Sequence, residues 1–341
     1  MKQDLLPREG RFYKANLHCH TTVSDGKYTP EQVKELYKSH GYSVVAYTDH
    51  DVMISHDELN DEGFLALHGY EIESTQWDVQ PPKARKTCHL CLIALDPDDM
   101  TQVCWHRSKY MIGHGAEYRD RVRFDESLPD FERAYTPERV NEVIRAAKEH
   151  GYFVTYNHPV WSLENYQDYI RYEGMDAMEI CNYSCYVSGY TEYNGKIYDD
   201  MLRAGKRIFC IGADDNHNAR PAESKRFDSC GAFTVIKAES LDYRAITGAL
   251  SRGDFYASQG PEIRELWFED GKLAVRTSAA ERIVMTTGTR KLRSVTREAG
   301  QTLRSASFEV DRDDVYVRIT VEDKRGLHAD SRAYFIDELA F

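Results

Sequence analysis

The sequence lacks several features that point to membranes, secretion or nucleic acid. No apolar run approaches the roughly 20 residues that a membrane-spanning helix needs. The segment MKQDLLPREGRFYK at the start has no apolar core of signal-peptide length, so we do not expect export by that route. The formal net charge is −12, whereas general nucleic-acid binding needs a basic surface. We therefore expect a cytoplasmic protein without general affinity for membranes or nucleic acids.

Two catalytic signatures are also missing. No Gly-x-Gly-x-x-Gly follows the first predicted strand, which removes the usual signal for dinucleotide binding. The chain shows no strand–turn–helix nucleophile elbow, so nothing indicates catalysis by an activated serine.

Cysteine is present but does not predict a disulfide framework. Eight cysteines are scattered along a chain without an export signal, which indicates reduced thiols. Two close pairs could be half-sites of a zinc ribbon, Cys88 with Cys91 and Cys181 with Cys185. Both pairs lie in strand-like runs and lack ribbon spacing, so we favour ordinary buried thiols.

The composition is that of a globular protein, with 41% hydrophobic and 29% charged residues over 341 positions. Through about residue 257, predicted strands alternate with helices in roughly seven steps, which favours a (β/α) barrel over a Rossmann sheet. Thr29 and Thr136 are predicted N-caps, each followed by proline. After residue 258 only short strand-like runs follow, which predicts a small β-sandwich. We therefore predict a barrel domain over 1–258 and an all-β domain over 259–341.

Residues 96–135 interrupt the barrel pattern. The segment is aromatic, rich in arginine and lysine, and shows no clean period. An excursion of this length inside a compact domain is usually functional, such as a lid or binding loop. Two interpretations of its cations stay open. They form a solvated face, or some of them bind phosphate over the barrel mouth, because the arginine guanidinium binds phosphate in a bidentate manner. With an asparagine that follows a later strand, the candidate substrate-binding residues are Arg107, Lys109, His114, Arg119 and Asn182.

Histidines and acidic residues collect near the ends of the predicted strands. His18 and His20 share one face because alternate strand residues point the same way, and Asp215 with His217 repeats the spacing. Imidazole nitrogens and carboxylate oxygens are common metal ligands, whereas a fold gains little from clustering histidines. The candidate set is His18, His20, Asp25, His50, Glu71, His89, His158, Asp215 and His217. Nine ligands are too many for one tetrahedral ion and suit two or three.

Periodicity leaves two choices within this set. Glu73 shares a strand face with Glu71, so the two remain alternatives. Asp214 precedes Asp215, although the spacing to His217 favours Asp215.

The chain carries an ordered series of motifs: His18-Cys-His20, Asp25-Gly26, Thr48-Asp49-His50, Gly69-Tyr-Glu71, His89, Asn157-His158-Pro159 and Asp215-Asn-His217. Over residues 12–257 this series resembles the PHP (polymerase and histidinol phosphatase) family. The resemblance implies a distorted (β/α)7 barrel with two or three ions, often manganese, iron or zinc. One ion would be held by His18, His20, Glu71 and Asp215. Glu71 would bridge to a second ion with His89 and His158, and a third would take Asp25, His50 and His217. The β-rich tail resembles the C-terminal extension of some two-domain PHP-like hydrolases.

We therefore predict a metal-dependent hydrolase, first of all a phosphoesterase for a small phosphorylated metabolite or nucleotide. A metal-bound hydroxide would attack phosphorus, with Asp25 and His217 as candidates for proton transfer. Asp49 is a candidate to orient a ligand histidine. Two alternatives stay open: hydrolysis of a carboxylic ester, carbamate or amide on the same ions, and a non-catalytic metal-binding module.

Overall fold

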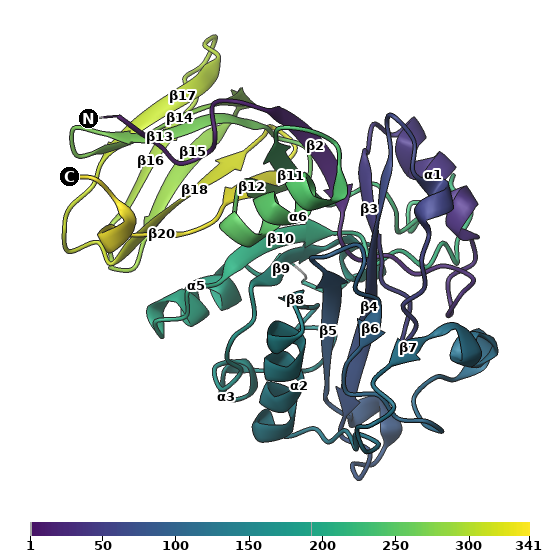
Figure 1. Ribbon diagram of the computed structural model, residues 1–341. Coiled ribbons are helices and arrows are strands. Elements are labelled where there is room, and N and C mark those ends of the chain that lie inside the picture. Colours follow the sequence, from purple (N-terminus) through teal and green to yellow (C-terminus); the bar gives the residue numbers. More distant parts are fainter. Residues whose placement is uncertain (1, 192) are drawn as a thin grey trace.

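The computed structural model describes residues 2–191 and 193–341 (Figure 1). The strands through residue 258 are β1 (Gln3–Asp4), β2 (Arg11–Asn16), β3 (Val44–Tyr47), β4 (Leu65–Thr75), β5 (Thr87–Ala94), β6 (Thr101–Gln102), β7 (Arg123–Phe124), β8 (Tyr152–Tyr156), β9 (Ala177–Asn182), β10 (Phe209–Ala213), β11 (Phe233–Ala238) and β12 (Phe255–Ser258). The α-helices are α1 (Pro30–Ser39), α2 (Pro137–Glu149), α3 (Tyr166–Tyr169), α4 (Tyr183–Ser188), α5 (Gly195–Arg203) and α6 (Tyr243–Arg252).

The strands after residue 258 are β13 (Ile263–Glu269), β14 (Lys272–Ala280), β15 (Arg282–Thr287), β16 (Leu292–Thr296), β17 (Leu303–Glu309), β18 (Tyr316–Glu322), β19 (His328–Ser331) and β20 (Tyr334–Phe335). Short 3-10 turns complete the chain: η1 (Asp57–Leu59), η2 (Pro82–Ala84), η3 (Gly113–Arg121) and η4 (Ile336–Glu338).

Helices α1 and α2 begin where the sequence predicts. The Thr29 side chain accepts a hydrogen bond from the backbone N–H of Gln32, whose side chain caps Thr29 in return. Thr136 likewise accepts from the backbone N–H of Arg139. The buried face of α2 consists of Val140, Val143, Ile144 and Ala147, in the same hydrophobic cluster as β8. Each fully buried large aliphatic side chain contributes about 1.5–3 kcal/mol, so this face fixes the helix on the sheet.

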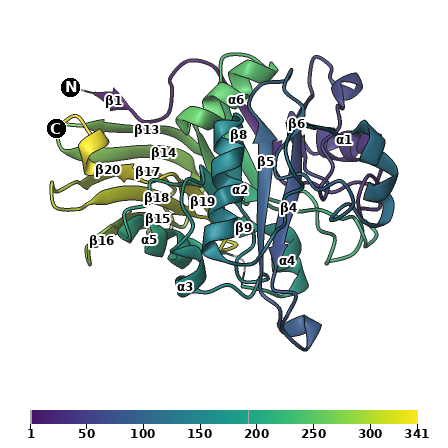
Figure 2. The same ribbon diagram turned by 60° about the horizontal axis from the view of Figure 1, so that its bottom comes forward.

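One large sheet runs through the molecule in the order β10-β9-β8-β5-β4-β3-β2-β11-β12-β19-β18-β15-β16 (Figures 1 and 2). Strands β2, β3 and β4 are parallel, and so are β8, β9 and β10. Strand β5 runs antiparallel to both β4 and β8, and β11 runs antiparallel to β2. The prediction of about seven uniform strand–helix steps is therefore wrong at β5, because no α-helix separates β4 from β5.

The two halves of this sheet meet beyond the ends of β2 and β10. The Asp215 backbone N–H donates to the His18 carbonyl over 3.0 Å, and the His20 N–H donates to the Asn216 carbonyl over 3.1 Å. These bonds form an isolated bridge between Cys19 and Asn216 rather than a continuous ladder. The architecture is thus a mixed α/β fold around a strongly bent sheet, and strand pairing among the described residues does not close it into a barrel.

A second sheet combines the N-terminal strand β1 with three strands after residue 258, in the order β1-β13-β14-β17. This sheet shares a hydrophobic core with β15, β18 and β19 of the large sheet, through residues such as Leu266, Phe268, Ile283 and Ile319. Figure 1 shows these strands at one end of the molecule, together with both termini. The packing of the two sheets is sandwich-like, but β12 pairs with β19, so the large sheet continues across residue 258 and the predicted all-β domain is only partly evident.

A buried arginine ties the two parts together. The Arg318 guanidinium on β18 contacts both carboxylate oxygens of Asp199 on α5 over 2.9 Å and Asp330 over 3.2 Å. Tyr316 donates a further hydrogen bond to Asp199 over 2.9 Å. A buried ion pair of this kind requires its hydrogen-bond partners to be in place, so it fixes the position of α5 against β18.

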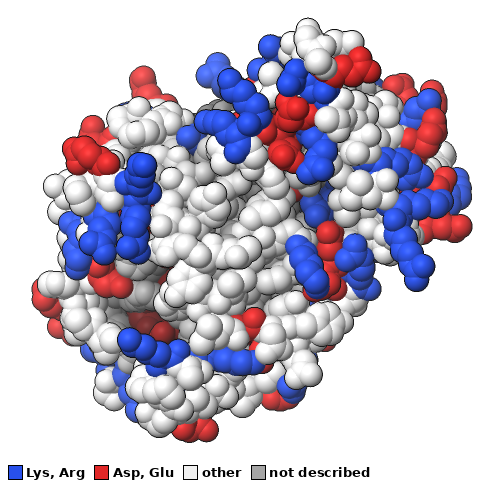
Figure 3. Space-filling model, turned by 180° about the vertical axis from the view of Figure 1, so that it is seen from behind, with Lys and Arg blue, Asp and Glu red and all other residues white. Residues whose placement is uncertain are grey.

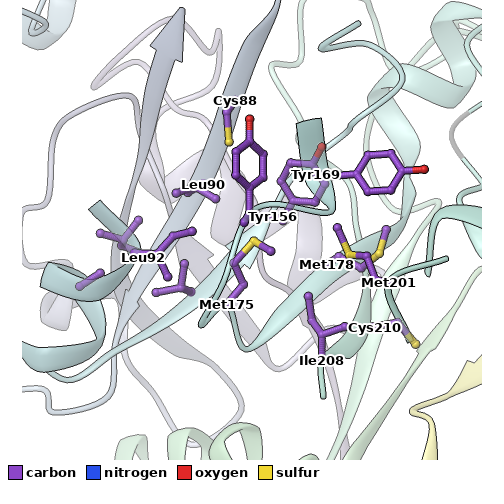
Figure 4. Close-up of a cluster of buried hydrophobic side chains, with 14 of the residues drawn as sticks. Cys88, Leu90, Leu92, Tyr156, Tyr169, Met175, Met178, Met201, Ile208 and Cys210 are labelled. Atoms are coloured by element: carbon purple, nitrogen blue, oxygen red, sulfur yellow. The ribbon is translucent and has the colours of Figure 1, made fainter. Parts of the chain in front are cut away.

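The molecular surface and the interior differ sharply in composition. On the face in Figure 3, Lys and Arg are interspersed with Asp and Glu around a broad area of other residues. Figure 4 shows part of the largest buried cluster, where Leu90, Leu92, Tyr156, Met178 and Met201 lie close together. Among the described residues, no helix combines the length and apolarity that crossing a membrane requires.

Candidate metal centre

The candidate ligands are placed by backbone hydrogen bonds that extend the sheet past its regular strands. His18 and His20 follow β2, and the N–H of Thr48 donates to the carbonyl of Cys19 between them over 2.9 Å. His50, just after β3, forms a bridge with Glu71 in β4. On the other side, the Asn157 N–H donates to the His89 carbonyl over 3.1 Å, which sets His158 beside β5. Residues far apart in sequence therefore converge on one point.

Glu71 lies at the centre of this convergence and is 1% exposed. Ring nitrogens of five histidines approach its carboxylate: His89 at 3.1 Å, His18 and His50 at 3.2 Å, His158 at 3.3 Å and His20 at 3.4 Å. Asn157 donates a hydrogen bond to the same carboxylate over 2.9 Å. Glu73 contacts His89 alone among these histidines, at 3.4 Å, and is about one third exposed. The geometry therefore favours Glu71 over Glu73 as the shared ligand.

Asp215 completes the buried side of the cluster. Its Oδ1 lies 3.1 Å from His20 Nε2 and 3.2 Å from His18 Nε2, and Asn182 donates to its Oδ2 over 3.1 Å. Asp214 faces away, where it accepts hydrogen bonds from Tyr37 and from the backbone N–H groups of residues 230–232. The choice of Asp215 over Asp214 from spacing thus agrees with the structure.

A more exposed group of donors lies on the other side of His20. Asp25 Oδ1 is 3.6 Å from His20 Nδ1, while its Oδ2 is 3.5 Å from His217 Nε2 and 3.9 Å from His50 Nε2. The rings of His20 and His217 stack with centroids 4.3 Å apart. The structure therefore brings together all nine residues of the predicted ligand set.

Several donor atoms of the cluster have no hydrogen-bond partner within the part of the chain that the structure describes. Among the described residues, His20 Nδ1 and both ring nitrogens of His89 are buried without a hydrogen-bond partner. His18 Nε2 and His20 Nε2 lie 3.1 Å apart. Such unsatisfied polar atoms are costly unless something else binds them, and imidazole nitrogens with carboxylate oxygens are suited to a divalent cation. The residues present therefore fit metal ions.

Four groups of these side chains place their donor atoms within 4.8 Å of one another. They are His20, Asp25, His50 and His217; His18, His158 and Asp215; His18, Glu71 and Cys91; and His50, Glu71 and His89. The grouping overlaps with the three predicted ion sites but differs in detail, because His20 lies with Asp25, His50 and His217.

The charges in the cluster are mutually dependent. Burial alone would raise the pKa of Glu71, but the neighbouring histidines hold it well below its usual range. Burial opposes protonation of His89, yet Glu71 and Glu73 raise its pKa to about 10. Burial and the adjacent His20 lower the pKa of His50 to about 4. Replacing protons with cations would therefore preserve the charge balance.

Residues behind the donors orient them through hydrogen bonds, and Glu179, which makes two of these bonds, was not predicted from the sequence. Glu179 in β9 is fully buried and accepts from His18 Nδ1 over 2.7 Å and from the His158 backbone N–H over 2.8 Å. Carboxylates in this position fix the orientation of a ligand histidine. Asp49 instead holds the loop before Asp25, accepting hydrogen bonds from Thr21 and Ser24. A glutamate inside a buried apolar strand was the available signal for Glu179.

The donors open into a cavity of about 690 Å³. Its wall also includes Trp161 after β8, Ser184 and Tyr190 around α4, and two arginines of the β10–β11 loop, Arg220 and Arg226. The sequence did not mark four of these positions, Trp161, Ser184, Arg220 and Arg226, because no pattern shows which loop will face a cavity.

The predicted substrate-binding residues are placed differently. Arg107 pairs with Asp130 over 2.7 Å, Lys109 pairs with Glu132 over 2.7 Å, and the Arg119 guanidinium donates to carbonyls of its own segment. These three do not line the cavity that holds the donors. His114 lies in an adjoining pocket of about 360 Å³ that shares Asp25, His50 and Glu73. Asn182 is buried beneath the cavity and bonds Glu179 and Asp215.

Comparison with known proteins gives a match to one family model and to part of one relative. The family model described as the PHP domain matches residues 16–272. A 5'-3' exoribonuclease of Haemophilus influenzae is 36% identical over 69 residues, 19% of this chain and 25% of that protein, so the chain spans a quarter of the length of this relative.

Two solved structures are more remote likenesses. A two-domain protein from Bacteroides vulgatus, described as containing a predicted PHP-like metal-dependent phosphoesterase, is 15% identical with a TM-score of 0.46, covering 97% of this chain and 98% of that one. An amidohydrolase from Chromobacterium violaceum is 17% identical with a TM-score of 0.39, covering 60% and 87%.

Proposed function

Because this chain belongs to the PHP domain family, we propose that it is a metal-dependent hydrolase of phosphoric esters. The proposed substrate is a small phosphorylated metabolite or nucleotide. The observation that carries the proposal is the position of Glu71, one buried carboxylate within 3.4 Å of five histidine rings. Two or three ions, of manganese, iron or zinc, are proposed for this donor set, with Glu71 bridging.

The proposed roles of the residues differ between the buried side of the cluster and the side that faces the cavity. Bound ions would supply an activated water and neutralise charge on a phosphoryl group. Glu179 holds the His18 ring in place through Nδ1, leaving Nε2 directed at Glu71 and Asp215. On the open side, Asp25 and His217 face the cavity, and we assign them proton transfer to the leaving group.

A panel of chromogenic esters tests the proposal. Chelator-treated protein would be assayed with p-nitrophenyl phosphate, bis-p-nitrophenyl phosphate and p-nitrophenyl acetate, before and after addition of Mn²⁺, Fe²⁺ or Zn²⁺. We expect hydrolysis of a phosphate ester that appears with metal and disappears in Glu71→Gln. The matched control is Glu132→Gln, which removes a half-exposed carboxylate remote from the donors.

The same panel separates the rival functions. Turnover of the acetate without any phosphate turnover would establish a carboxylic ester hydrolase on the same donors. Full metal occupancy without hydrolysis of any ester would identify a binding module. Comparison of the monoester with the diester decides between a phosphatase and a phosphodiesterase.

A further inference from the structure

Two cations in the cavity wall have no role in the donor cluster. Arg220 and Arg226 lie in the loop between β10 and β11 and line the same cavity as Asp25, His89 and His217. Within residues 2–191 and 193–341, neither guanidinium makes an ion pair or a hydrogen bond; the backbone N–H of Arg226 donates to the Ser224 hydroxyl. Their charges are therefore available to a ligand.

The arginines of the excursion differ from this pair. Arg107 pairs with Asp130, and Arg133 pairs with Asp51 while its guanidinium lies 4.0 Å above the Tyr110 ring. Arg119 donates to four backbone carbonyls. Arg107 and Arg119 are thus engaged within residues 96–135 and Arg133 with Asp51, whereas the two cavity arginines have no such partner among the described residues.

The base of the arginine-bearing loop is firmly held. Asp228 accepts hydrogen bonds from the backbone N–H groups of His217 over 2.9 Å and Asn218 over 3.1 Å. Asn218 in turn donates to the Ser229 hydroxyl over 2.7 Å. The two ends of the loop are therefore pinned beside the candidate ligand His217, and the exposed segment between them carries both arginines over the cavity.

Size and charge indicate what such a pair would bind. A cavity of about 690 Å³ is within the range of pockets for whole small molecules, so it holds more than one phosphate group. Carboxylates such as Asp25, Glu73 and Asp228 line the same cavity, so an anion that lies away from the proposed metal ions needs cations of its own in the wall. Guanidinium forks bind both carboxylates and phosphates.

We propose that Arg220 and Arg226 form a second anion subsite, so that the substrate carries a further carboxylate or phosphate group besides the ester held at the donor cluster. This inference rests on the proposed function for the first group only. The second anion is recognised by the arginines, independently of whether the ester is cleaved.

Binding of non-hydrolysable phosphonates tests the subsite. Manganese-treated protein would be titrated by calorimetry with phenylphosphonate, 4-carboxyphenylphosphonate and 1,4-phenylenebisphosphonate. We expect at least one doubly anionic probe to bind about tenfold or more tightly than phenylphosphonate, from charge-assisted hydrogen bonds. Arg220→Ala and Arg226→Ala should each remove most of this advantage and leave phenylphosphonate affinity unchanged. The carboxylate and bisphosphonate arms distinguish the two sources of the second anion.

Matched variants make the result specific. Lys225→Ala removes an exposed cation of the same loop that does not line the cavity, and it should change nothing. Arg226→Lys keeps the charge but loses the fork, so it should retain part of the advantage. Circular dichroism would verify the fold of each variant.

Three outcomes would overturn the subsite. In the first, the arginine variants lose as much affinity for phenylphosphonate as for the doubly anionic probes. In the second, they keep the full preference for a doubly anionic probe. In the third, the unmodified chain shows no such preference. Absence of phosphoester hydrolysis alongside the expected preference would reject the proposed function and support the subsite.

Discussion

Two regions of this molecule are rich in histidine and charged residues, and they use them in opposite ways. In the excursion, residues 96–135, His106 is held by its own segment: it accepts from the N–H groups of Ser108 and Lys109, and its other nitrogen contacts Glu132. In the donor cluster, five histidine rings converge on the carboxylate of Glu71, and three ring nitrogens have no hydrogen-bond partner among the described residues. A high number of charged residues does not mark a functional site. Buried polar atoms that converge on one point and lack hydrogen-bond partners do mark one.

The sharpest test of this contrast compares one carboxylate from each region. Glu71→Gln should lower metal-dependent phosphoesterase activity by about 10³-fold or more, since losing even one electrostatic stabiliser can cost 10²–10³-fold. Glu132→Gln should stay within about twofold of the unmodified chain, because Glu132 is itself exposed and does not line the donor cavity. Initial rates with p-nitrophenyl phosphate measure both. Comparable losses in the two variants would remove the distinction between the regions.

A third carboxylate, Glu164, is buried like Glu71, and its titration extends the comparison to the pH dependence of stability. Burial raises its pKa to about 7, although Tyr135, Tyr156 and Tyr172 donate hydrogen bonds to it. Because the folded pKa exceeds the ordinary 4.5, its contribution to stability is full below pH 4.5 and is lost as pH rises through 7.

The free energy of unfolding should therefore fall between pH 4.5 and 8 by an amount on the order of 3 kcal/mol more than in Glu164→Gln, which does not titrate. Denaturant unfolding at several pH values measures this difference. Identical pH profiles for the two proteins would show that Glu164 does not titrate in this range.

Removal of the Glu179 carboxylate, which orients His18, should lower metal affinity and activity less than removal of the Glu71 carboxylate. Glu179→Gln keeps the shape but weakens the hold on His18 Nδ1, and outer-shell losses typically cost 10–100-fold in metal affinity or activity. Competition with a chelator gives the metal affinity. A loss as large as that of Glu71→Gln would place Glu179 among the direct ligands instead.

The smallest effect is expected in the excursion. Arg119→Ala removes hydrogen bonds to the carbonyls of residues 106, 107, 109 and 111, which should lower stability by about 1 kcal/mol and leave activity unchanged. Thermal unfolding and steady-state kinetics would be measured on the same sample. A raised KM without loss of stability would instead support the prediction that Arg119 binds substrate.

The sequence was informative where local rules act. The N-caps at Thr29 and Thr136 and the pairing of Asp215 with His217 follow from short-range geometry, and the structure agrees with each. The reversed direction of β5 could not be read from TCHLCLIA, because alternation reveals which side chains share a face but carries no strand direction. The helix-free connection of residues 76–86 was the available hint, since parallel pairing needs a longer crossover.

The residues of the cavity wall could not be predicted from the sequence for a different reason. Arg220 and Arg226 belong to an exposed loop without periodicity, and only the position of β10 beside β2 turns that loop toward the donors. The cations of the excursion are dense in sequence, but Arg107 and Arg119 have their acceptors within the same segment and Arg133 pairs with Asp51. Tertiary pairing, rather than composition, separates the two loops.

The central claim is that the cluster around Glu71 holds catalytic metal ions, and metal content tests it most directly. Chelator-treated protein would be reconstituted with Mn²⁺, Fe²⁺ or Zn²⁺, desalted and measured by inductively coupled plasma mass spectrometry beside Glu71→Gln. The account predicts two or three equivalents per chain, fewer in Glu71→Gln, and hydrolysis that rises with occupancy. Less than one equivalent with every metal, or full hydrolysis in the metal-free protein, would contradict it.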